Sequence, residues 1–380
     1  MDYNKESLEM HKEKKGKLEL KSKVKIETKD DLSIAYTPGV AQPCRVIAKD
    51  ESKVYDYTIK SNTVAIVSDG SAVLGLGNIG PKAAIPVMEG KAILLKEFAN
   101  VDAFPICLDT QDTTEIIETV KRIAPVFGGI NLEDISAPRC FEIEKRLQEE
   151  LDIPVFHDDQ HGTAIVVLAG LINALKLTDK KIEDTKIILN GAGAAGIAIA
   201  NLLYKAGAKD MLMCDSKGII VKGRDNLNEA KEKVLKFTNL NNLTGDLSTA
   251  MVGADVFIGI SKGNLLTKEM VKTMNEKPMI FAMANPTPEI MPEDAKDAGA
   301  FIVATGRSDF PNQINNVLAF PGIFRGLLDN RINKVTNEIK LSVAKAIAEY
   351  VDDLSVEKIV PNALDKGVAS VVAKAVKDTV

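Results

Sequence analysis

The stretch "KIILNGAGAAGIAIANLLYKAGAKDMLMCD" at residues 186–215 decides the fold of this chain. The apolar run "KIILN" predicts a buried strand, "IAIANLLYK" has apolar residues at helical spacing, and "MLMCD" predicts a second strand. Between the first strand and the helix stands "GAGAAG", which fits the pattern G-x-G-x-x-G. A strand, a glycine turn, a helix and a strand in this order predict a dinucleotide-binding unit.

Each glycine of this turn has its own predicted role. Gly191 permits a tight turn, Gly193 lets the backbone approach a pyrophosphate, and Gly196 lets the helix lie close to the strand. The helix N-terminus then offers free N–H groups to the phosphates. Asp215 stands 19 positions after Gly196, where an acid accepts hydrogen bonds from the adenosine ribose. The other predicted cofactor-binding residues of the turn are Ala192, Ala194 and Ala195.

Outside this unit, short apolar segments alternate with helical patterns from residue 62 onward, which is typical of parallel sheets covered by helices. The predicted strands are "TVAIVSD", "AFPICLD", "FGGINLE", "PVFHDD", "KIILNGA", "MLMCD", "DVFIGIS", "MIFAMAN" and "FIVATG". We therefore predict an α/β protein with an N-terminal α/β domain over residues 1–160. A doubly wound Rossmann-type domain over 161–329 and closing helices over 330–380 follow it.

A second glycine pattern, "GLGNIG" at residues 75–80, lacks the frame that the first one has. The segment "SDGSAV" separates it from the preceding strand, and Pro81 follows at once. No acid ends a strand about 20 residues further on, as the dinucleotide fingerprint requires. We interpret it either as a plain loop or as a wall against a second ligand.

Composition indicates an ordinary soluble protein. Of 380 residues, 45% are hydrophobic and 27% are charged, and the net charge of −5 gives no field for nucleic acid. No secretory signal is present at the start of the sequence, and the apolar run in "TAIVVLAGLINALKL" is shorter than a membrane span and predicts a buried helix. The four cysteines show no C-x-x-C spacing and predict reduced thiols in a cytoplasmic protein.

Two pairs of adjacent carboxylates follow predicted strands: Glu133 with Asp134, and Asp158 with Asp159. Helix capping explains either pair taken alone. Because carboxyl ends of parallel strands share one crevice, two such pairs suggest a cation, and oxygen ligands suit Mg²⁺ or Mn²⁺. His157 and His161 are interpreted as residues behind the ligands or in the packing, not as zinc ligands.

The chain resembles the malic enzymes, most closely the short prokaryotic type, from about Leu32 to the closing helices. The motifs that carry the resemblance are "YTPGVA", "DGSAVLGLGNIGPKAAIPVMEGKAILLKEFANVDAFPICLDT", "FGGINLEDI", "PVFHDDQHGTAI", "GAGAAG", "ANPTPEI" and "TGRSDFPNQINNVLAFPGIFRG". The resemblance implies oxidation of L-malate by NAD(P)⁺ with a divalent metal, decarboxylation to pyruvate and CO₂, and a homodimer.

The resemblance also implies residue roles. Tyr36 becomes the general acid and Lys91 the general base, with Asp158 beside Lys91 to hold and tune it. A base must be neutral, so we expect the metal and partial burial to lower the pKa of Lys91. The implied metal ligands are Glu133, Asp134 and Asp159. The implied substrate contacts are Asn285, which also faces the cofactor, and Asn316, with Asn315 as a possible neighbour.

Some questions stay open at this level. Larger malic enzymes have an Arg where this chain has Ala72, so backbone N–H groups of the glycine turn or Arg307 are alternatives for that contact. Asp215 favours NAD, whereas Ser216 and Lys217 leave NADP open. The sequence does not say whether Tyr36 serves its own chain or a neighbour. An oxaloacetate decarboxylase on the same scaffold is the nearest alternative, and a nucleotide-sensing module without catalysis is a distant one.

Overall fold

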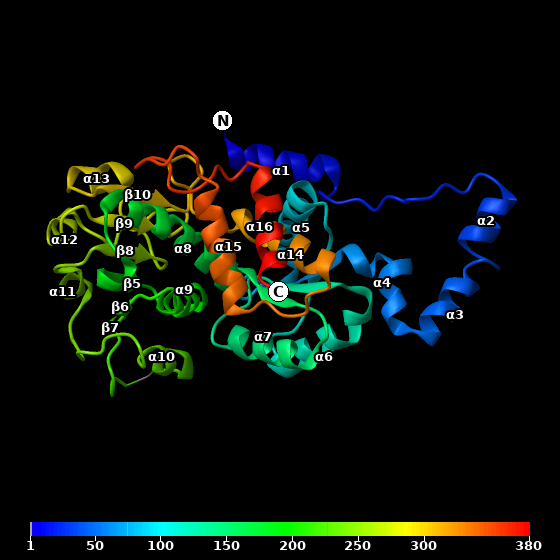
Figure 1. Ribbon diagram of the computed structural model, residues 1–380, viewed down its shortest axis with the longest axis horizontal. Helices are drawn as coiled ribbons and strands as arrows, with labels where there is room; N and C mark the ends of the chain where they lie inside the picture. Colours follow the sequence, from blue (N-terminus) through cyan, green and yellow to red (C-terminus); the bar gives the residue numbers. More distant parts are fainter. Residues whose placement is uncertain (1, 74, 226) are drawn as a thin grey trace.

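Two separate sheets organise the chain (Figure 1). The computed structural model describes residues 2–73, 75–225 and 227–380. The first sheet has the strand order β2-β1-β3-β4, and the second has the order β10-β9-β8-β5-β6-β7. All nine predicted strands are present and pair in parallel, which confirms the α/β fold class.

The first sheet is built around β1, whose six residues are all buried. An apolar run without alternation suits a strand that is covered on both faces. The strands of this sheet are β1 (Thr63–Ser68), β2 (Asp102–Cys107), β3 (Gly129–Leu132) and β4 (Val155–His157). The helices between them are α5 (Gly80–Ala99), α6 (Thr113–Ile123), η3 (Ala124–Val126) and α7 (Arg139–Glu150).

The second sheet carries the glycine turn between β5 and α9. Its strands are β5 (Lys186–Asn190), β6 (Asp210–Asp215), β7 (Gly218–Ile219), β8 (Val256–Gly259), β9 (Met279–Ala282) and β10 (Ile302–Thr305). Its connecting helices are α9 (Ala194–Lys205), α10 (Glu229–Val234), α11 (Leu247–Met251), α12 (Lys268–Lys272) and α13 (Pro292–Asp297). The two-residue strand β7, which pairs antiparallel with β6, was not predicted because two residues carry no periodicity.

Helix α8 (Asp158–Thr178) runs from the first sheet to the second, followed by η4 (Ile182–Asp184). It is long and apolar enough to cross a membrane, but most of its residues are buried inside the protein, as predicted for a core helix. One large hydrophobic core joins residues of both sheets with this helix. The predicted boundary between residues 160 and 161 falls in the first turn of α8.

The closing helices pack where the two sheets meet. They are η5 (Asn316–Leu318), α14 (Phe320–Asn330), α15 (Asn337–Glu349) and α16 (Gly367–Asp378). Helix α14 packs on α5 and α16, and α15 packs on α8. Residues 330–380, for which helices were predicted, thus contain α15 and α16.

The N-terminal segment differs from the rest of the chain. Its helices are α1 (Tyr3–Lys14), α2 (Lys29–Ala35), α3 (Ala41–Lys49), η1 (Glu51–Lys53), α4 (Val54–Tyr57) and η2 (Ile59–Asn62). Helix α1 lies beside α5, whereas α2 and α3 project away from both sheets (Figure 1). None of the residues of α1, α2 or α3 is buried. We call residues 17–49 the arm.

Candidate active site

Strand register brings the two carboxylate pairs to one edge of the first sheet. Leu132, the last residue of β3, pairs with His157, the last residue of β4. Glu133 and Asp134 follow the first of these strands, and Asp158 and Asp159 follow the second. Oxygen atoms of Glu133, Asp134 and Asp159 all lie within 4.8 Å of one another. The structure therefore gathers the three predicted metal ligands in one cluster.

Two of the three members of the cluster are buried, the side chain of Asp159 is 31% exposed, and the cluster is not used for helix capping. Glu133 is 4% exposed and Asp134 is 5% exposed. Asp159 accepts a hydrogen bond from the backbone N–H of Asp134 at 2.7 Å, and no side chain caps the start of α8. Oδ2 of Asp134 is buried without a hydrogen-bond partner. A buried oxygen without a partner is costly, so this atom fits a cation ligand.

Lys91 reaches this cluster from the middle of α5. Its Nζ lies 2.6 Å from Oδ2 of Asp158 and 2.8 Å from Oε1 of Glu133. The ammonium also lies 4.3 Å from the centre of the Phe320 ring. The side chain of Lys91 is 8% exposed and that of Asp158 is fully buried. Lys91 and Asp158 thus contact each other as predicted.

Burial and repulsion among these carboxylates dominate their pKa values. Burial raises the pKa of Glu133 well above its usual range, although Lys91 partly offsets this shift. Burial, with the charge of Asp159, raises the pKa of Asp134 to about 7. Burial also raises the pKa of Asp158 to about 6 against the opposing effect of Lys91. A bound cation would therefore favour the ionised forms of these carboxylates.

Lys91 differs from the sequence-based expectation of partial burial and a lowered pKa. It is almost fully buried, and burial alone does lower its pKa. The attraction of Asp158, Glu133 and Asp159 outweighs burial, so the pKa of Lys91 is raised above its ordinary value. The expectation counted the charge of a metal ion, whereas in the chain alone the carboxylates are not neutralised.

A layer of polar side chains lies behind the predicted metal ligands. Nε2 of His157 lies 3.1 Å from Oδ2 of Asp159, and Nδ1 of His157 lies 2.6 Å from the amide of Gln160. Gln160 and His161 both contact Glu144 on α7, at 3.2 and 2.8 Å. His157 and His161 thus lie behind the cluster, as interpreted from the sequence. Glu144 was missed, because a Glu inside an amphipathic helix gives no local signal.

The glycine turn of the second sheet has the shape that a dinucleotide needs. Gly191 has φ +131°, and a methyl group added at Gly196 would overlap the carbonyl oxygen of Gly191. A methyl group added at Gly193 would meet nothing within 4 Å, so open space lies above this backbone. Helix α9 begins at Ala194, directly after this space. The turn therefore presents a free helix N-terminus to an anionic group.

Asp215 ends β6, as predicted, but its carboxylate already has cationic partners. It contacts the Arg224 guanidinium, the Lys231 ammonium at 2.7 Å and the backbone N–H of Lys217 at 2.9 Å. Despite partial burial, these groups lower the pKa of Asp215 to about 2. Arg224 and Lys231 were not predicted as partners of Asp215, because the loop after β7 and helix α10 bring them there.

The second glycine pattern, at residues 75–80, lies near the loop that carries Asn285. A methyl group added at Gly75 would lie 3.7 Å from the backbone oxygen of Asn285. The Nδ2 atom of Asn285 would be 2.9 Å from a methyl group at Gly306. Across the same region, a methyl group at Gly162 would lie 3.2 Å from Cβ of Asn316. Asn285 therefore lies against the glycine pattern, and Asn316 lies beside the start of α8.

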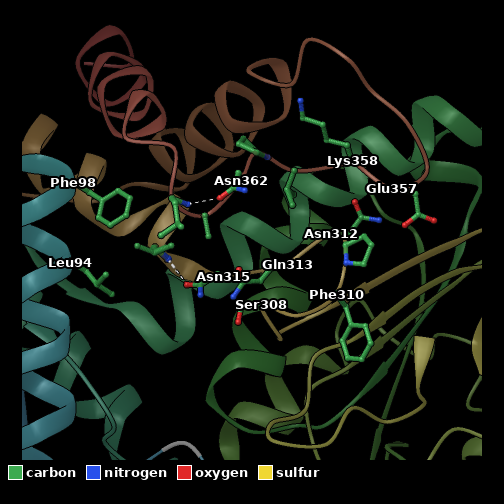
Figure 2. A pocket seen from close by; sticks show the side chains of 16 residues that line it. Leu94, Phe98, Ser308, Phe310, Asn312, Gln313, Asn315, Glu357, Lys358 and Asn362 are labelled. Carbon is green, nitrogen blue, oxygen red and sulfur yellow. Dashed lines mark hydrogen bonds between the residues drawn. The ribbon is translucent and has the colours of Figure 1, made fainter. Parts of the chain in front are cut away.

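Asn315 lies on a cavity of about 640 Å³ between α5 and the loops around residues 308–317 and 357–364. Figure 2 shows Leu94 and Phe98 on the α5 side of this cavity, facing Ser308 and Asn315. The side chain of Asn315 accepts a hydrogen bond from the backbone N–H of Val317 at 3.0 Å. The lining of this cavity includes none of the carboxylates of the cluster.

Comparison with known proteins agrees with this geometry. Residues 14–148 match the family description "Malic enzyme, N-terminal domain", and residues 160–379 match "Malic enzyme, NAD binding domain". The chain belongs to the malic enzyme family. As a member it is an oxidoreductase that uses a nicotinamide cofactor.

Relatives and solved structures of this family match nearly the whole chain. The "Bifunctional malic/malolactic enzyme" of Bacillus subtilis is 60% identical over 99% of this chain and 92% of the relative. The "NAD-dependent malic enzyme" of Geobacillus stearothermophilus is 60% identical over 95% of this chain and 76% of the relative. The crystal structure of the NAD-dependent malic enzyme from Thermotoga maritima is 54% identical, with a TM-score of 0.95 over 98% of each chain.

The side chain of Arg139 contacts the loop that contains Ala72. Arg139 lies 2.9 Å from Asp69 and donates hydrogen bonds to the hydroxyl groups of Ser71 and Ser136. Arg307, the alternative considered from the sequence, is held by Asp309 and by the backbone oxygen of Pro286. Arg139 thus fixes the loop beside the carboxylate cluster, and this role was not predicted from the sequence.

Tyr36 is the one predicted catalytic residue of this malic enzyme that lies outside the cluster. It follows α2 in the arm and is 66% exposed. Helix α2 stands far from α5, which carries Lys91 (Figure 1). One chain therefore does not bring Tyr36 and Lys91 together.

Proposed function

We propose that this malic enzyme oxidises L-malate with NAD(P)⁺ and a divalent cation, and decarboxylates the product to pyruvate and CO₂. The contact of Lys91 with Glu133 and Asp158 carries the proposal, because it joins a proton acceptor to a cluster of oxygen ligands. Relatives from several bacteria are malic enzymes, which supports malate as the substrate.

The described residues fit Mg²⁺ or Mn²⁺. Glu133, Asp134 and Asp159 would hold the cation, because their oxygens lie close together and no Cys or His belongs to the group. The unpartnered Oδ2 of Asp134 and the raised pKa values of Glu133 and Asp134 both point to missing positive charge. When bound, a divalent cation supplies Lewis-acid polarisation of the C2 oxygen, and the nicotinamide ring accepts a hydride.

Lys91 is the proposed general base, and Tyr36 the proposed general acid. Neutral Lys91 takes the proton of the C2 hydroxyl group, and Asp158 holds its ammonium afterwards at 2.6 Å. After CO₂ has left, Tyr36 gives a proton to C3. We further propose that Asn285, Asn315 and Asn316 contact the substrate, and that Asn285 also faces the nicotinamide.

We propose that the active site is completed in a homodimer, with Tyr36 supplied by the partner subunit. The arm that carries Tyr36 exposes several apolar side chains, which favours burial against another chain. These side chains are Leu20, Val24, Ile26, Leu32, Ile34 and Val40. Tyr36 itself is exposed, so it is free to enter a neighbouring site.

NAD is the proposed cofactor. Gly191, Gly193 and Gly196 with Ala192, Ala194 and Ala195 would hold its pyrophosphate, and Asp215 its adenosine ribose. NAD-dependent relatives at 60% and 54% identity support this choice. Arg224 and Lys231, the two cations beside Asp215, also suit a 2′-phosphate, so NADP is tested beside NAD.

We propose that the enzyme works in the cytoplasm. Its cysteines are free thiols, which is consistent with that reducing compartment.

The deciding experiment follows the products from malate and from oxaloacetate, each with NAD⁺ and with NADP⁺. We expect equal amounts of pyruvate and reduced cofactor from malate, only when Mg²⁺ or Mn²⁺ is present. Full turnover in excess EDTA would contradict the metal assignment. Consumption of oxaloacetate without any oxidation of malate would favour an oxaloacetate decarboxylase instead.

The name of the Bacillus subtilis relative adds one further product to this assay. A malolactic enzyme converts malate to lactate and CO₂ without net reduction of the cofactor. Lactate is therefore measured beside pyruvate, and lactate without reduced cofactor would assign the malolactic reaction to this chain.

A further inference from the structure

A second cavity, of about 740 Å³, lies between the two halves of the molecule. Residues of α7, α8, α9, α10 and α15 line it. The lining contains none of the proposed metal ligands, neither Lys91 nor Tyr36, and none of residues 191–196. Its volume is in the range of small-molecule sites, which is about 300–1,000 Å³. The malate reaction proposed above makes no use of this space.

The charged side chains that line this cavity are mostly cationic. Five of them are basic and two are acidic, whereas the whole chain has a net charge of −5. The basic ones are Arg139, Lys145, Lys205, Lys233 and Lys340, and the acidic ones are Glu142 and Glu229. A cavity of positive potential in an acidic protein attracts anions.

Part of this positive charge has no acidic partner. Arg139, Lys145 and Lys233 each lie within 4.0 Å of a carboxylate, on Asp69, Glu149 and Glu229. Among the residues that the structure describes, Lys205 and Lys340 have no carboxylate within that distance. Lys205 is exposed at the rim, whereas Lys340 is only 8% exposed. Lys205 is thus an exposed cation of the lining, and Lys340 is a buried one.

Lys340 is the more informative of the two. Its Nζ lies 3.1 Å from Nδ1 of His161, a neutral acceptor when Nε2 of that ring donates to Glu144. An ammonium has three N–H donors, and this contact uses one. Burial lowers the pKa of Lys340, although Glu144 partly offsets the effect. The surroundings therefore leave the charged form of Lys340 short of acceptors.

The cavity also offers apolar surface beside these cations. Phe141 on α7, with Ile197 and Leu202 on α9, belongs to the lining. Inorganic ions gain nothing from such surface, whereas an organic body does. We propose that this cavity binds a small organic anion, a carboxylate or phosphate ester whose charged group meets Lys340 and whose apolar part meets Phe141, Ile197 and Leu202.

A continuous series of contacts links this site to the proposed metal centre. Lys340 contacts His161, and His161 contacts Glu144 at 2.8 Å. Gln160 joins Glu144 to His157, and His157 contacts Asp159 at 3.1 Å. An anion that moves Lys340 acts directly on this series, so its binding and metal binding are coupled.

Calorimetry with phenyl phosphate as the probe tests the binding site without any catalytic step. The titration is done with the full chain, NAD⁺ at saturation and no metal, so it stands even if the proposed reaction is wrong. We expect phenyl phosphate to bind more tightly than inorganic phosphate, and benzyl alcohol not to bind.

Variants of matched shape then locate the bound probe. Lys340→Met keeps an unbranched side chain and removes the charge, and it should weaken binding of phenyl phosphate at least tenfold. Lys205→Met should weaken it several-fold. Lys345→Met, on the exposed face of the same helix, is the control and should change nothing. Absence of binding, or equal binding by Lys340→Met and Lys345→Met, would overturn the site.

The coupling has its own measurement. Calorimetric titration of Mn²⁺ into the metal-free chain, with and without phenyl phosphate, should give dissociation constants that differ several-fold. The Lys340→Met variant should lose this difference. Identical Mn²⁺ binding in both conditions would overturn the link to Asp159.

Discussion

The cluster around Lys91 and the arm that carries Tyr36 are opposites within one chain. The cluster is buried at an edge of the first sheet, and its members contact one another at 2.6 to 2.8 Å. No residue of α2 or α3 in the arm is buried, and Ile34 is 75% exposed to solvent. In a single chain, the proposed base and the proposed metal ligands therefore lie together. The proposed acid, Tyr36, lies apart from them.

Removal of the proposed base should have the largest effect. Lys91→Ala is expected to lower kcat for malate oxidation by about 10³-fold or more, because proton transfer from the C2 hydroxyl is lost. NADH binding, measured by fluorescence titration, should remain. Lys96→Ala, an exposed lysine one to two turns further along α5, is the control and should keep its activity. Near-normal turnover by Lys91→Ala would make the base assignment wrong.

A mixture of two inactive variants tests whether the arm serves its neighbour. Tyr36→Phe is expected to lower kcat by about 10²-fold or more, because the acid is lost. If Tyr36 acts across a dimer, subunit exchange in an equal mixture of Tyr36→Phe and Lys91→Ala restores about a quarter of wild-type activity. About half of the dimers are then mixed, and each mixed dimer has one intact site of its two.

Activity of the mixture is compared with that of each variant alone after the same incubation. If Tyr36 served its own chain, no mixed dimer would contain an intact site. A mixture no more active than its parts, in dimers shown by mass spectrometry to have exchanged, would therefore contradict the shared site.

Replacement of an apolar residue of the arm should have a smaller effect, which is on assembly of the proposed dimer. Ile34→Asp should weaken the dimer about tenfold or more, because it places a charge in the proposed interface. The free energy of unfolding of the single chain should change by about 0.5 kcal/mol or less, since the side chain is exposed there. Sedimentation measures the dimer, and Leu240→Asp, another exposed apolar site, is the control.

The pH dependence of metal binding concerns the buried cluster alone and is the smallest effect. The pKa of Asp134 is raised to about 7 in the metal-free chain, so the carboxyl is protonated below that pH. A cation must then displace the proton, and Mn²⁺ affinity should fall by up to about tenfold per pH unit below 7. In Asp134→Asn the affinity should be lower and this dependence weaker. Calorimetry at several pH values measures both.

Much of the fold was predictable because it depends on local patterns. Buried parallel strands are continuous apolar runs, and all nine were found at their predicted places. The glycine turn was predictable because strand, turn and helix are neighbours in sequence. The two-residue strand β7 and the extent of α8 were not, because neither has a periodicity that marks its ends.

Of the candidate site, the residue types were predictable and several of their partners were not. Glu133, Asp134, Asp158 and Asp159 stand next to strand ends, which is visible in the sequence. Arg139, Glu144, Arg224 and Lys231 come to their partners from other elements, at separations that no local pattern encodes. The sign of the pKa shift of Lys91 also depended on how many carboxylates surround it.

The sequence by itself determined the two sheets, the dinucleotide turn and the family resemblance, because each depends on residues that are close together along the chain. Only the tertiary structure decided that Lys91 also contacts Glu133, and that Gly75 lies near Asn285. It alone showed that Tyr36 stands away from Lys91. Distances between distant segments are set by how helices and sheets pack, and packing is a property of the whole folded chain.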